Sequence, residues 1–403
     1  MNCRIAPFSK WDRKSYYYPD MPKNYQISQY DLPLSADGYF DIPLADGTLK
    51  RVGIIRAHLE EDAGKNLHEG LDHTRVDLNR AGTPLLEIVT QPDIENAEEA
   101  YTFCVELQRL VRFLGISDAD MQKGQMRFEP NVNVAITHEG REYRTPISEV
   151  KNLNSFRSVR GAIEYEIHRQ VTAWEADHSY TLENVGKLNF GWDDAHERTE
   201  FQRGKEESHD YRYFPDPDLV PVTTDDEWVE GNRVAIGELP VARQRRFMSD
   251  YGISTKDCEI ILADATTASL YESAVNSGVE PKVVTRQFVG VWNNLAASAC
   301  ETIGSLGLSA DVVAEMARIV EDGTISAGSA ARLAERLYQD RAGGWRSPRD
   351  LAGELGLIQE RDEGAGAAGS MKRSRPIRRP SRMRWARTNA KQRPRPAFCA
   401  DKS

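Results

Sequence analysis

The stretch YFDIPLADGTLKRVGII, residues 39–55, decides the fold of the first half of the chain. Phe40, Ile42 and Leu44 alternate with other residues, Ala-Asp-Gly at 45–47 is turn sequence, and a second strand-like run follows. Alternation with a period of two is typical of a strand with one buried face. The stretch therefore predicts a β-hairpin over residues 38–62.

A second strand region follows at residues 126–136, MRFEPNVNVAI. Its alternation places one set of residues on an apolar face and another on a polar face: Met126, Phe128, Val132, Val134 and Ile136 against Arg127, Glu129, Asn131 and Asn133. THEGRE then provides a turn, and YRTPISEVKNL (143–153) predicts an antiparallel neighbour. One side of this sheet is expected to be strongly polar.

Two amphipathic helices interleave with these strands, at residues 96–115 and 155–176. Asn96 with Glu99 resembles a capping box, and Gly115 marks the end of the first helix. Strands mixed with helices predict an α+β domain with a mostly antiparallel sheet flanked by helices, placed at residues 1–228.

Beyond that domain the pattern becomes helical. Residues 308–340, LSADVVAEMARIVEDGTISAGSAARLAERLYQD, predict an αα-hairpin with a stop at Gly323 and a cap at Ser326. We expect a helical domain at residues 229–287 and a second, incomplete helical tail domain at 288–364. Either an interaction platform or a binder of a large ligand fits this helical region.

The net charge changes sharply near the C-terminus. Residues 371–403 hold 12 Lys or Arg against Asp401, a net of +11, so the first 370 residues must carry −21 to give the total of −10. A basic tail fits a phosphate-binding arm, but a disordered or non-native terminus is the favoured interpretation, because the segment has four prolines and no apolar periodicity.

Several classes of protein are disfavoured. The longest apolar runs fall far short of the roughly 18 residues that a membrane span needs, and the first residues lack the features of a signal peptide, so the cytoplasm is the expected location. The five cysteines are scattered, without the short spacings of a zinc site or redox pair, and are expected to be reduced. Phosphate-loop, HExxH and GxSxG motifs are absent.

Polar clusters remain as the candidates for chemistry. In RAHLEEDAGK (56–65), alternation places Arg56, His58 and Glu60 on one strand face and turns Glu61 away. A His and carboxylates beside a cation suit a divalent ion such as Mg²⁺. For an isolated acidic triplet a solvated strand end is the more common explanation, but the recurrence of such clusters along the chain changes that weighing.

Further carboxylates occur in largely apolar surroundings at Glu87, Glu129 and Glu149. Buried carboxylates usually have a partner, and basic residues that can serve are Arg80, Arg127, Lys151 and Lys205. A structural salt-bridge network and a site for a polyanionic substrate both remain open.

The segment HDYRYFPDPDLVPV, residues 209–222, is dense in rings and charges. Arg212 lies between Tyr211 and Tyr213, where its guanidinium can stack and bind a carboxylate or phosphate. Pro215 and Pro217 favour extended conformations in the residues before them. A proline-rich linker would not need this composition.

These stretches, together with RKSYYYPDMPKNYQISQYD (13–31), DLNRAGTPLLEIV (77–89), EVKNLNSFR (149–157) and KEESHDYRYFPDPDL (205–219), resemble the B subunit of the aspartyl/glutamyl-tRNA(Asn/Gln) amidotransferases. The resemblance covers about residues 2–363. It implies a cradle-like catalytic domain, a helical domain and a tRNA-gripping tail domain.

The resemblance also implies a ligase activity. ATP and Mg²⁺ would activate the side-chain carboxylate of Glu-tRNA(Gln) or Asp-tRNA(Asn) by phosphorylation, and ammonia from the amidase (A) subunit would displace phosphate; a small C subunit would complete the complex. The residues implied as catalytic are Glu60, Glu61, Lys151, Lys205, Glu206 and Arg212. Those expected around the nucleotide are Arg80, Arg127, Asn131 and Asn152, and those around the metal are His58, Glu60 and Glu61.

Two departures from the family pattern stand beside this resemblance. The chain starts beyond the family's Glu-x-His strand and cysteine-rich zinc motif, so no zinc site is expected here. Residues 365–403 resemble nothing in the family, as a shifted reading frame would produce. The alternative function is therefore a catalytically incomplete scaffold that binds tRNA or joins a complex.

Overall fold

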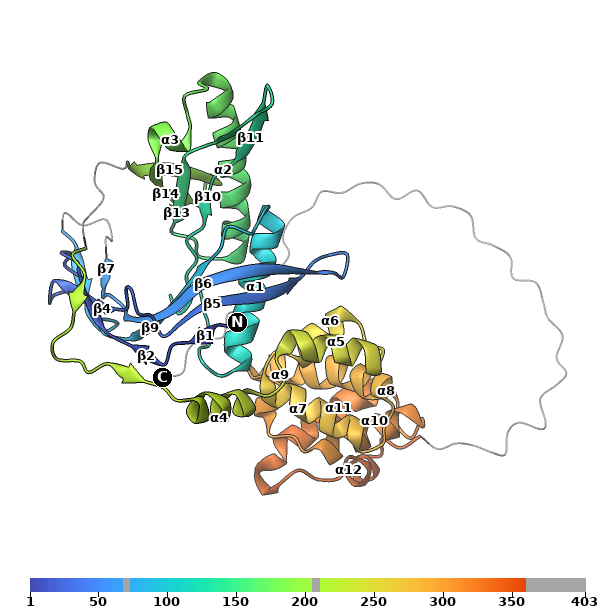
Figure 1. Cartoon of the computed structure of the whole chain (residues 1–403). Helices are drawn as coiled ribbons and strands as arrows, with labels where there is room; N and C mark the ends of the chain where they lie inside the picture. Colours follow the sequence, from blue (N-terminus) through green and yellow to red (C-terminus); the bar gives the residue numbers. More distant parts are fainter. Residues whose placement is uncertain (68–72, 205–210, 360–403) are drawn as a thin grey trace, which may run out of the picture. The chain divides into compact units, whose positions relative to one another are not determined.

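The computed structural model describes residues 1–67, 73–204 and 211–359 of the chain. The chain forms two compact units, Met1–Arg246 and Phe247–Ser403. The first unit combines helices and sheets and the second is helical, which confirms the α+β prediction (Figure 1). Within the described ranges, no helix combines the length and apolar character that a bilayer crossing requires.

The first sheet has the order β1-β5-β6-β9, and all its pairs are antiparallel. Its strands are β1 (Arg4–Ile5), β5 (Ser35–Pro43), β6 (Leu49–Glu61) and β9 (Pro84–Thr90). The hairpin predicted from residues 39–55 is confirmed as β5 and β6. Gly47 adopts φ +84° in its turn, where the Asp46 carboxylate accepts a hydrogen bond from the Thr48 backbone N–H (2.9 Å). A positive φ suits glycine, which has no Cβ.

The second sheet has the order β10-β13-β14-β15. Its strands are β10 (Asn131–Val132), β13 (Ile147–Lys151), β14 (Lys187–Asp193) and β15 (Arg198–Arg203). The pair β13–β14 is parallel, and the other two pairs are antiparallel.

The prediction of one continuous strand over residues 126–136 is wrong. The chain instead forms β10 and then a separate ribbon of β11 (Ala135–His138) and β12 (Arg141–Arg144). The break lies at Val134, whose N–H donates to the Thr145 hydroxyl (2.7 Å). The Val134 carbonyl accepts from the Thr145 N–H (3.0 Å), so Thr145 holds the point where the chain leaves the sheet through both its backbone and its side chain.

The first unit contains helices of different lengths, the first of which begins at its predicted cap, Asn96. They are α1 (Ala97–Phe113), α2 (Phe156–Ala176), α3 (Leu182–Val185), α4 (Asp226–Ile236) and α5 (Pro240–Asp250), the last of which continues into the second unit. The Asn96 side chain accepts from the Glu99 N–H, the Ser155 side chain caps α2, and Gly115 adopts φ +66° just beyond α1. These contacts satisfy backbone groups that helix ends leave without partners.

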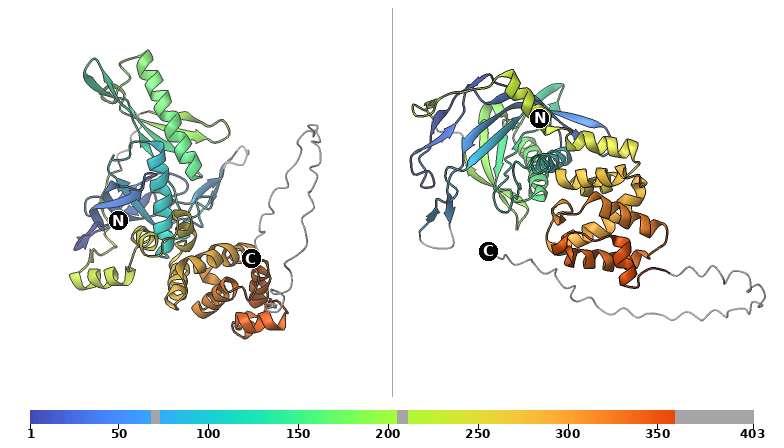
Figure 2. Two further views of the ribbon diagram at one scale, coloured as in Figure 1. Left: turned by 90° about the vertical axis from the view of Figure 1, so that its right-hand side faces the viewer. Right: turned by 90° about the horizontal axis from the view of Figure 1, so that it is seen from below.

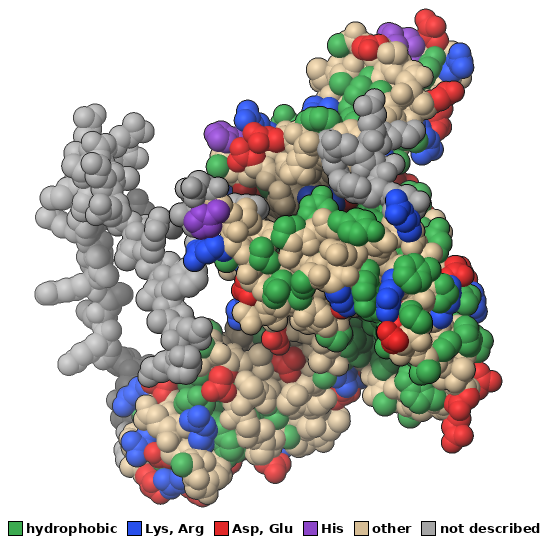
Figure 3. Space-filling view, turned by 90° about the vertical axis from the view of Figure 1, so that its left-hand side faces the viewer, with side chains coloured by type: hydrophobic (Ala, Val, Ile, Leu, Met, Phe, Trp, Pro, Cys, Tyr) green, Lys and Arg blue, Asp and Glu red, His purple; other side chains and the backbone are tan. Residues whose placement is uncertain are grey.

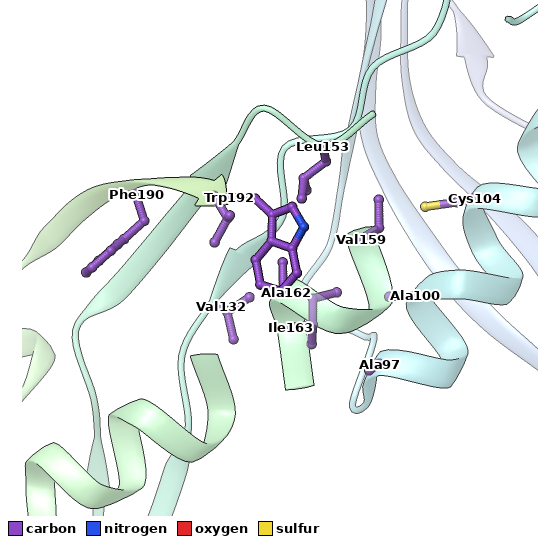
Figure 4. Packing of buried hydrophobic residues seen from close by; sticks show 11 residues of the cluster. Ala97, Ala100, Cys104, Val132, Leu153, Val159, Ala162, Ile163, Phe190 and Trp192 are labelled. Carbon is purple, nitrogen blue, oxygen red and sulfur yellow. The ribbon is translucent and has the colours of Figure 1, made fainter. Parts of the chain in front are cut away.

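Helix α1 contributes to two apolar cores. Phe103, Leu107 and Leu110 pack with residues of β5 and β6, whereas Ala97, Ala100 and Cys104 join the core of α2 and the second sheet (Figure 4). In Figure 2, α1 runs beside both α2 and the first sheet. One helix thus connects the two sheets that carry the candidate residues.

Short strands form further small sheets, and two of these sheets attach the last part of the first unit to its beginning. The short strands are β2 (Phe8–Ser9), β3 (Asp12–Ser15), β4 (Tyr25–Ser28), β7 (Lys65–Leu67), β8 (Arg75–Asp77), β16 (Phe214–Pro215) and β17 (Val222–Thr223). The pairings are β16-β3-β4, β17-β2 and β7-β8. The segment that follows Tyr211 therefore lies against strands from the first 30 residues.

The second unit contains only helices among its described residues. They are α6 (Thr255–Ile261), α7 (Ala265–Asn276), α8 (Pro281–Gln287), a π-helical turn (Phe288–Trp292), α9 (Asn293–Ala299), 3₁₀ turns at Gly304–Leu306 and Arg341–Gly343, α10 (Ala310–Glu321), α11 (Ala327–Gln339) and α12 (Pro348–Glu354). The predicted αα-hairpin is confirmed, with Gly323 at φ +73° and Ser326 capping α11.

The domain boundaries at 228 and 287 stay predictions. Along the chain, the boundary between the two compact units falls between Arg246 and Phe247, inside helix α5. Helical backbone continues from α8 through Phe288, which closes α8 in the αR conformation. The segment 365–403 lies outside the described residues.

Candidate functional site

The strands β6 and β9 bring a histidine and two glutamates together. His58 pairs directly with Glu87 in the antiparallel register, and Glu60 lies two residues farther along β6. Because directly paired residues, and residues two apart, share a face of a sheet, all three side chains project to the same side. Sequence alternation predicted this face for His58 and Glu60.

A β-bulge in β6 determines which residues project to that face. Ile54 pairs with Thr90 and Arg56 pairs with Val89, so Ile55 is an extra residue on β6. Ile54 belongs to the core beneath α1. The bulge turns the next residues over, and Arg56, His58 and Glu60 consequently project away from that core.

The three side chains have the spacing of metal ligands. His58 Nε2 lies 3.7 Å from Glu60 Oε2 and 3.9 Å from Glu87 Oε2, and one ligand atom from each residue falls within 4.8 Å of the others. Ligands at the roughly 2.0–2.1 Å typical of Mg²⁺ lie about 3 Å apart when adjacent and about 4 Å apart when opposite. His58 and Glu60 are buried and Glu87 is 43% exposed, so the group opens toward solvent at Glu87.

Glu60 is ionised despite its burial. Burial is the largest influence on its pKa and raises it, but hydrogen bonding with His58, the charge of Lys14 and the Ser28 hydroxyl together hold the Glu60 pKa below its usual value. Ser28 Oγ donates to Glu60 Oε2 at 3.3 Å. In the described part of the chain His58 Nδ1 is buried without a hydrogen-bond partner. An ionised carboxylate beside an imidazole is a donor set that fits a divalent cation.

Glu61 does not join this group. Its Oε1 accepts a hydrogen bond from the Ile27 N–H (2.8 Å), and its carboxylate forms an ion pair with Lys23. Both contacts attach β4 to β6. The structure therefore groups Glu87, in place of Glu61, with His58 and Glu60.

Arg80 and Arg127 meet at a buried aspartate. Asp62 Oδ2 lies 2.5 Å from an Arg127 nitrogen and 3.5 Å from Arg80 Nε. Arg80 also donates to the carbonyls of Ala63 (2.9 Å) and Gly64 (2.8 Å), so it braces the turn that follows β6. Arg127 is 43% exposed and has the more accessible guanidinium of the two.

The candidates Lys151, Asn131 and Asn152 lie on or directly beside the second sheet. Lys151 Nζ lies 3.1 Å from Glu149 and 3.5 Å from Glu129. Asn131 pairs with Glu149 across β10 and β13. Burial is the largest influence on the Glu149 pKa and raises it, but Lys187 and Lys151 outweigh burial and hold this pKa below its usual value.

Two further observations concern Asn152 and Lys151. Asn152 adopts φ +65° beside Gly191, where a Cβ would come within 3.2 Å of Asn152 Nδ2. Burial raises the Tyr16 pKa most, and the nearby Lys151 charge opposes that rise.

The aromatic segment after residue 210 reaches the His58 group. The Tyr213 ring stacks on Tyr30 with centroids 4.3 Å apart. Burial raises the Tyr213 pKa to about 12, with further contributions from the charges of Glu60 and Glu87. Tyr211 receives the Lys14 ammonium over its ring at 4.9 Å. Lys14 therefore connects this segment with Glu60.

Arg13 fixes the same segment. Its Nε donates to Asp216 Oδ2 (2.7 Å), and its guanidinium lies over the Tyr25 ring at 4.4 Å. Asp216 also accepts from the N–H groups of Asp218 (2.7 Å) and Leu219 (3.1 Å). Charged hydrogen bonds of this kind hold a segment that has little regular structure of its own.

Arg212 has a strained backbone, with φ +45°, and an exposed side chain. The rings of its two neighbours, Tyr211 and Tyr213, contact each other edge to face, with centroids 6.2 Å apart. Lys205 and Glu206 lie outside the described residues. Their predicted roles stay predictions.

Glu87 and Lys14 are among the members of the site that sequence reasoning missed. Glu87 stood out as a carboxylate within an apolar strand, but its pairing with His58 depends on the register of β6 and β9. Lys14 belongs to a short strand far from the His58 cluster in sequence and carried no signal of its own. Only the fold brings these two residues to Glu60.

The face seen in Figure 3 presents hydrophobic side chains next to Lys and Arg. Exposed rings of the first unit include Tyr17 (69%), Tyr18 (44%) and Tyr30 (55%). Tyr16 and Tyr18 stack with centroids 4.9 Å apart. Rings beside cations suit ligands that combine planar groups with negative charge.

Comparison with known proteins shows which family the sequence resembles. Residues 1–230 match the family model described as the GatB/GatE catalytic domain. Over 343 residues, the chain is 44% identical to the B subunit of the aspartyl/glutamyl-tRNA(Asn/Gln) amidotransferase from Rhodopirellula baltica, with 84% of this chain and 69% of that protein covered. The protein of the same description from Caldanaerobacter subterraneus subsp. tengcongensis is 42% identical over 364 residues, covering 90% and 74%.

Proposed function

Because the chain belongs to the family of aspartyl/glutamyl-tRNA(Asn/Gln) amidotransferase B subunits, we propose that its first unit activates and amidates the side-chain carboxylate of an acidic amino acid esterified to tRNA. The activity is that of a carbon–nitrogen ligase in protein synthesis. The single observation that carries the proposal is the convergence of Lys14, Ser28, Tyr213 and the His58–Glu60–Glu87 group on one face of β6.

The reaction needs activation because a carboxylate resists attack by ammonia. In the proposed sequence, an oxygen of the amino acid's carboxylate attacks the γ-phosphorus of ATP, and ADP leaves. Ammonia then attacks the carbonyl carbon of the acyl phosphate, inorganic phosphate leaves with the C–O bonding pair, and the nitrogen loses a proton. Most of the catalysis in phosphoryl transfer comes from positioning and electrostatic stabilisation.

His58, Glu60 and Glu87 would hold a divalent cation in this scheme. When bound, Mg²⁺ neutralises charge on phosphate oxygens. The ionised Glu60 supplies negative charge for the cation, and Ser28 orients that carboxylate. Glu61 serves in the frame that supports β6.

Other residues surround the reacting groups. Lys14 approaches from the Tyr211 side and supplies positive charge near Glu60. Arg127 and Lys151 are half-exposed cations available to phosphate oxygens, although each now pairs with carboxylates. Arg80 braces the turn and contributes shape more than charge.

Partners follow from the same proposal. The chain would receive ammonia from an amidase partner, with a small third protein joining the two, and it would bind Glu-tRNA(Gln) or Asp-tRNA(Asn). The helical second unit is a candidate surface for tRNA.

The test measures ATP hydrolysis that depends on Glu-tRNA(Gln) or Asp-tRNA(Asn), with the partner subunits present. We expect Glu60→Gln to reduce this hydrolysis about 100-fold or more, since it removes charge from a group aimed at a transferring phosphoryl. Glu98→Gln, which alters an exposed carboxylate of α1, is the matched control. Binding of charged tRNA without any ATP turnover in the unsubstituted chain would favour the alternative function, a tRNA-binding scaffold.

A further inference from the structure

Arg56 is a half-buried arginine next to the His58–Glu60–Glu87 group. Within the ranges that the structure describes, its Nε is buried and has no hydrogen-bond partner. Burying an unpaired guanidinium nitrogen costs free energy, because water no longer solvates it. An arginine in this situation is suited to an anionic partner that the described residues do not supply.

Register places Arg56 on the same side of the sheet as the metal-ligand group. Arg56 pairs with Val89 on β9, and His58 pairs with Glu87, two residues away on each strand. The bulge at Ile55 turns Arg56 toward this face and away from the core that Ile54 enters. Its charge also acts on the Tyr213 hydroxyl, together with the charges of Glu60 and Glu87. These groups therefore share one small region.

A second arginine of β6, Arg51, has hydrogen-bond partners for its guanidinium. Arg51 donates from Nε (2.9 Å) and from a terminal nitrogen (3.1 Å) to the two Asp41 oxygens and lies 3.7 Å over the Tyr39 ring. This arrangement pairs Nε and one terminal nitrogen of the guanidinium with a single carboxylate. Arg56 has the same chemistry on the same strand, but among the described residues no carboxylate accepts from its Nε.

The neighbouring carboxylates of Glu60 and Glu87 lie against His58. Glu60 and Glu87 both approach His58 Nε2, at 3.7 and 3.9 Å. Glu60 additionally accepts from Ser28. A carboxylate that enters beside Glu87, the exposed member of the group, would meet the cation site on one side and the Arg56 fork on the other.

We propose that Arg56 binds the side-chain carboxylate of the esterified amino acid and thereby distinguishes the acidic substrate from its amide product. The inference rests on the proposed function and deepens it. A carboxylate offers two acceptor oxygens and a charge, which match two N–H groups of a guanidinium. The amide has one acceptor and presents an NH₂ donor to the other N–H, so the product binds more weakly.

The experiment compares equilibrium binding of Glu-tRNA(Gln) and Gln-tRNA(Gln) to the assembled enzyme without ATP. Both ligands carry the same tRNA, so the ratio of their Kd values isolates the side chain. We expect the unsubstituted enzyme to prefer the acid about 10- to 100-fold, the range of a charged hydrogen-bonded contact. Arg56→Gln should bring the ratio close to one, with Arg56→Lys intermediate. Arg51→Gln is the matched control and should leave the ratio unchanged.

Other results overturn the proposal. An acid preference that persists in a folded Arg56→Gln enzyme excludes this role, and so does the absence of any preference in the unsubstituted enzyme. If the preference persists while the KM for ATP rises, Arg56 binds a phosphoryl oxygen of the nucleotide instead. Should Arg56→Gln fail to fold, as judged by circular dichroism, Arg56→Lys decides the question, because it keeps the charge but loses the fork.

Failure of the proposed function gives a different signature. In that case the unsubstituted enzyme shows no ATP hydrolysis that depends on charged tRNA. The Kd ratio is measured without ATP, so it reports on Arg56 independently of turnover.

Discussion

His58 and Glu87 lie directly opposite each other on β6 and β9, with His58 Nε2 3.9 Å from Glu87 Oε2. The contact joins a buried imidazole to a half-exposed carboxylate across a single strand pair. Residues about 30 positions apart in sequence therefore come together in one group that could hold a metal ion.

Removing the charge of Glu87 should weaken divalent metal binding. We expect Glu87→Gln to raise the Kd for Mn²⁺ at least tenfold, because a neutral amide is a poorer ligand than a carboxylate. Isothermal titration calorimetry or Mn²⁺ electron paramagnetic resonance measures the change. Glu61→Gln separates the two possible ligand sets: a loss for Glu61→Gln as large as that for Glu87→Gln would contradict the grouping described here.

Asp216 should matter more for catalysis than its neighbour Asp218. Asp216 is buried and holds Arg13 Nε at 2.7 Å, whereas the Asp218 side chain is 83% exposed and lies 3.1 Å from the same guanidinium. We expect Asp216→Asn to lower kcat about tenfold, since it loosens the segment that carries Tyr213. Asp218→Asn should leave kcat nearly unchanged. Equal effects of the two substitutions on steady-state kinetics would refute this assignment.

Glu166 should dominate the acid stability of the second sheet. It is fully buried, and its oxygens accept from Arg169 (2.8 Å) and Thr199 (2.5 Å). Burial raises its pKa most, but Arg169, Ser148, Thr199 and Gln170 outweigh burial and hold the pKa below its usual value. Glu166→Ala should cost about 3–5 kcal/mol in free energy of unfolding at neutral pH, because it leaves Arg169 without this partner.

The sign of the pH effect follows from that lowered pKa. Stabilisation by ionised Glu166 is fully present above the pKa of an unfolded glutamate, about 4.3, and is lost as pH falls through the lower pKa of the folded state. Urea denaturation from pH 7 to pH 3 should therefore show a smaller pH-dependent loss in Glu166→Ala than in the unsubstituted chain. Glu164→Ala, at an exposed position of the same helix, is the control; if both variants respond to pH like the unsubstituted chain, Glu166 is not the group responsible.

Gly161 marks a close approach between α2 and the second sheet. A Cβ at this position would lie 3.4 Å from the Trp192 ring, which is within reach of ordinary contact. Figure 4 shows Trp192 within this core. We expect Gly161→Ala to stabilise the protein by up to about 1 kcal/mol through helix propensity, and Gly161→Leu to destabilise it by about 1–3 kcal/mol through overpacking. Thermal denaturation of the two variants measures both; destabilisation by Ala comparable to that by Leu would show that even a methyl group does not fit.

Local features of the sequence predicted much of the fold. The β5–β6 hairpin, the caps at Asn96 and Ser326 and the helix-ending Gly115 depend on neighbouring residues, so the sequence shows them directly. The break at Val134 depends on Thr145, a residue 11 positions away, and the alternation of residues 126–136 therefore gave no sign of it.

In the candidate site as well, relationships within one strand could be predicted, and those between strands could not. Alternation placed His58 and Glu60 on one face and Glu61 on the other, because that relationship stays within one strand. Glu87 and Lys14 required the register of β9 and the position of β3, which are set by tertiary contacts. The roles implied for Lys205 and Glu206 lie outside the described residues and stay predictions.

The extra residue Ile55 gives β6 positions that differ in their sensitivity to length. Upstream and downstream of it, inward and outward positions alternate in opposite phase. Without Ile55, Ile54 and Arg56 would pair with Thr90 and Val89 as neighbours, so strict alternation opposite β9 would be restored and Arg56, His58 and Glu60 would stay on their side. Deleting a regularly paired residue such as Ala57 would instead turn His58 and Glu60 into the apolar layer under α1.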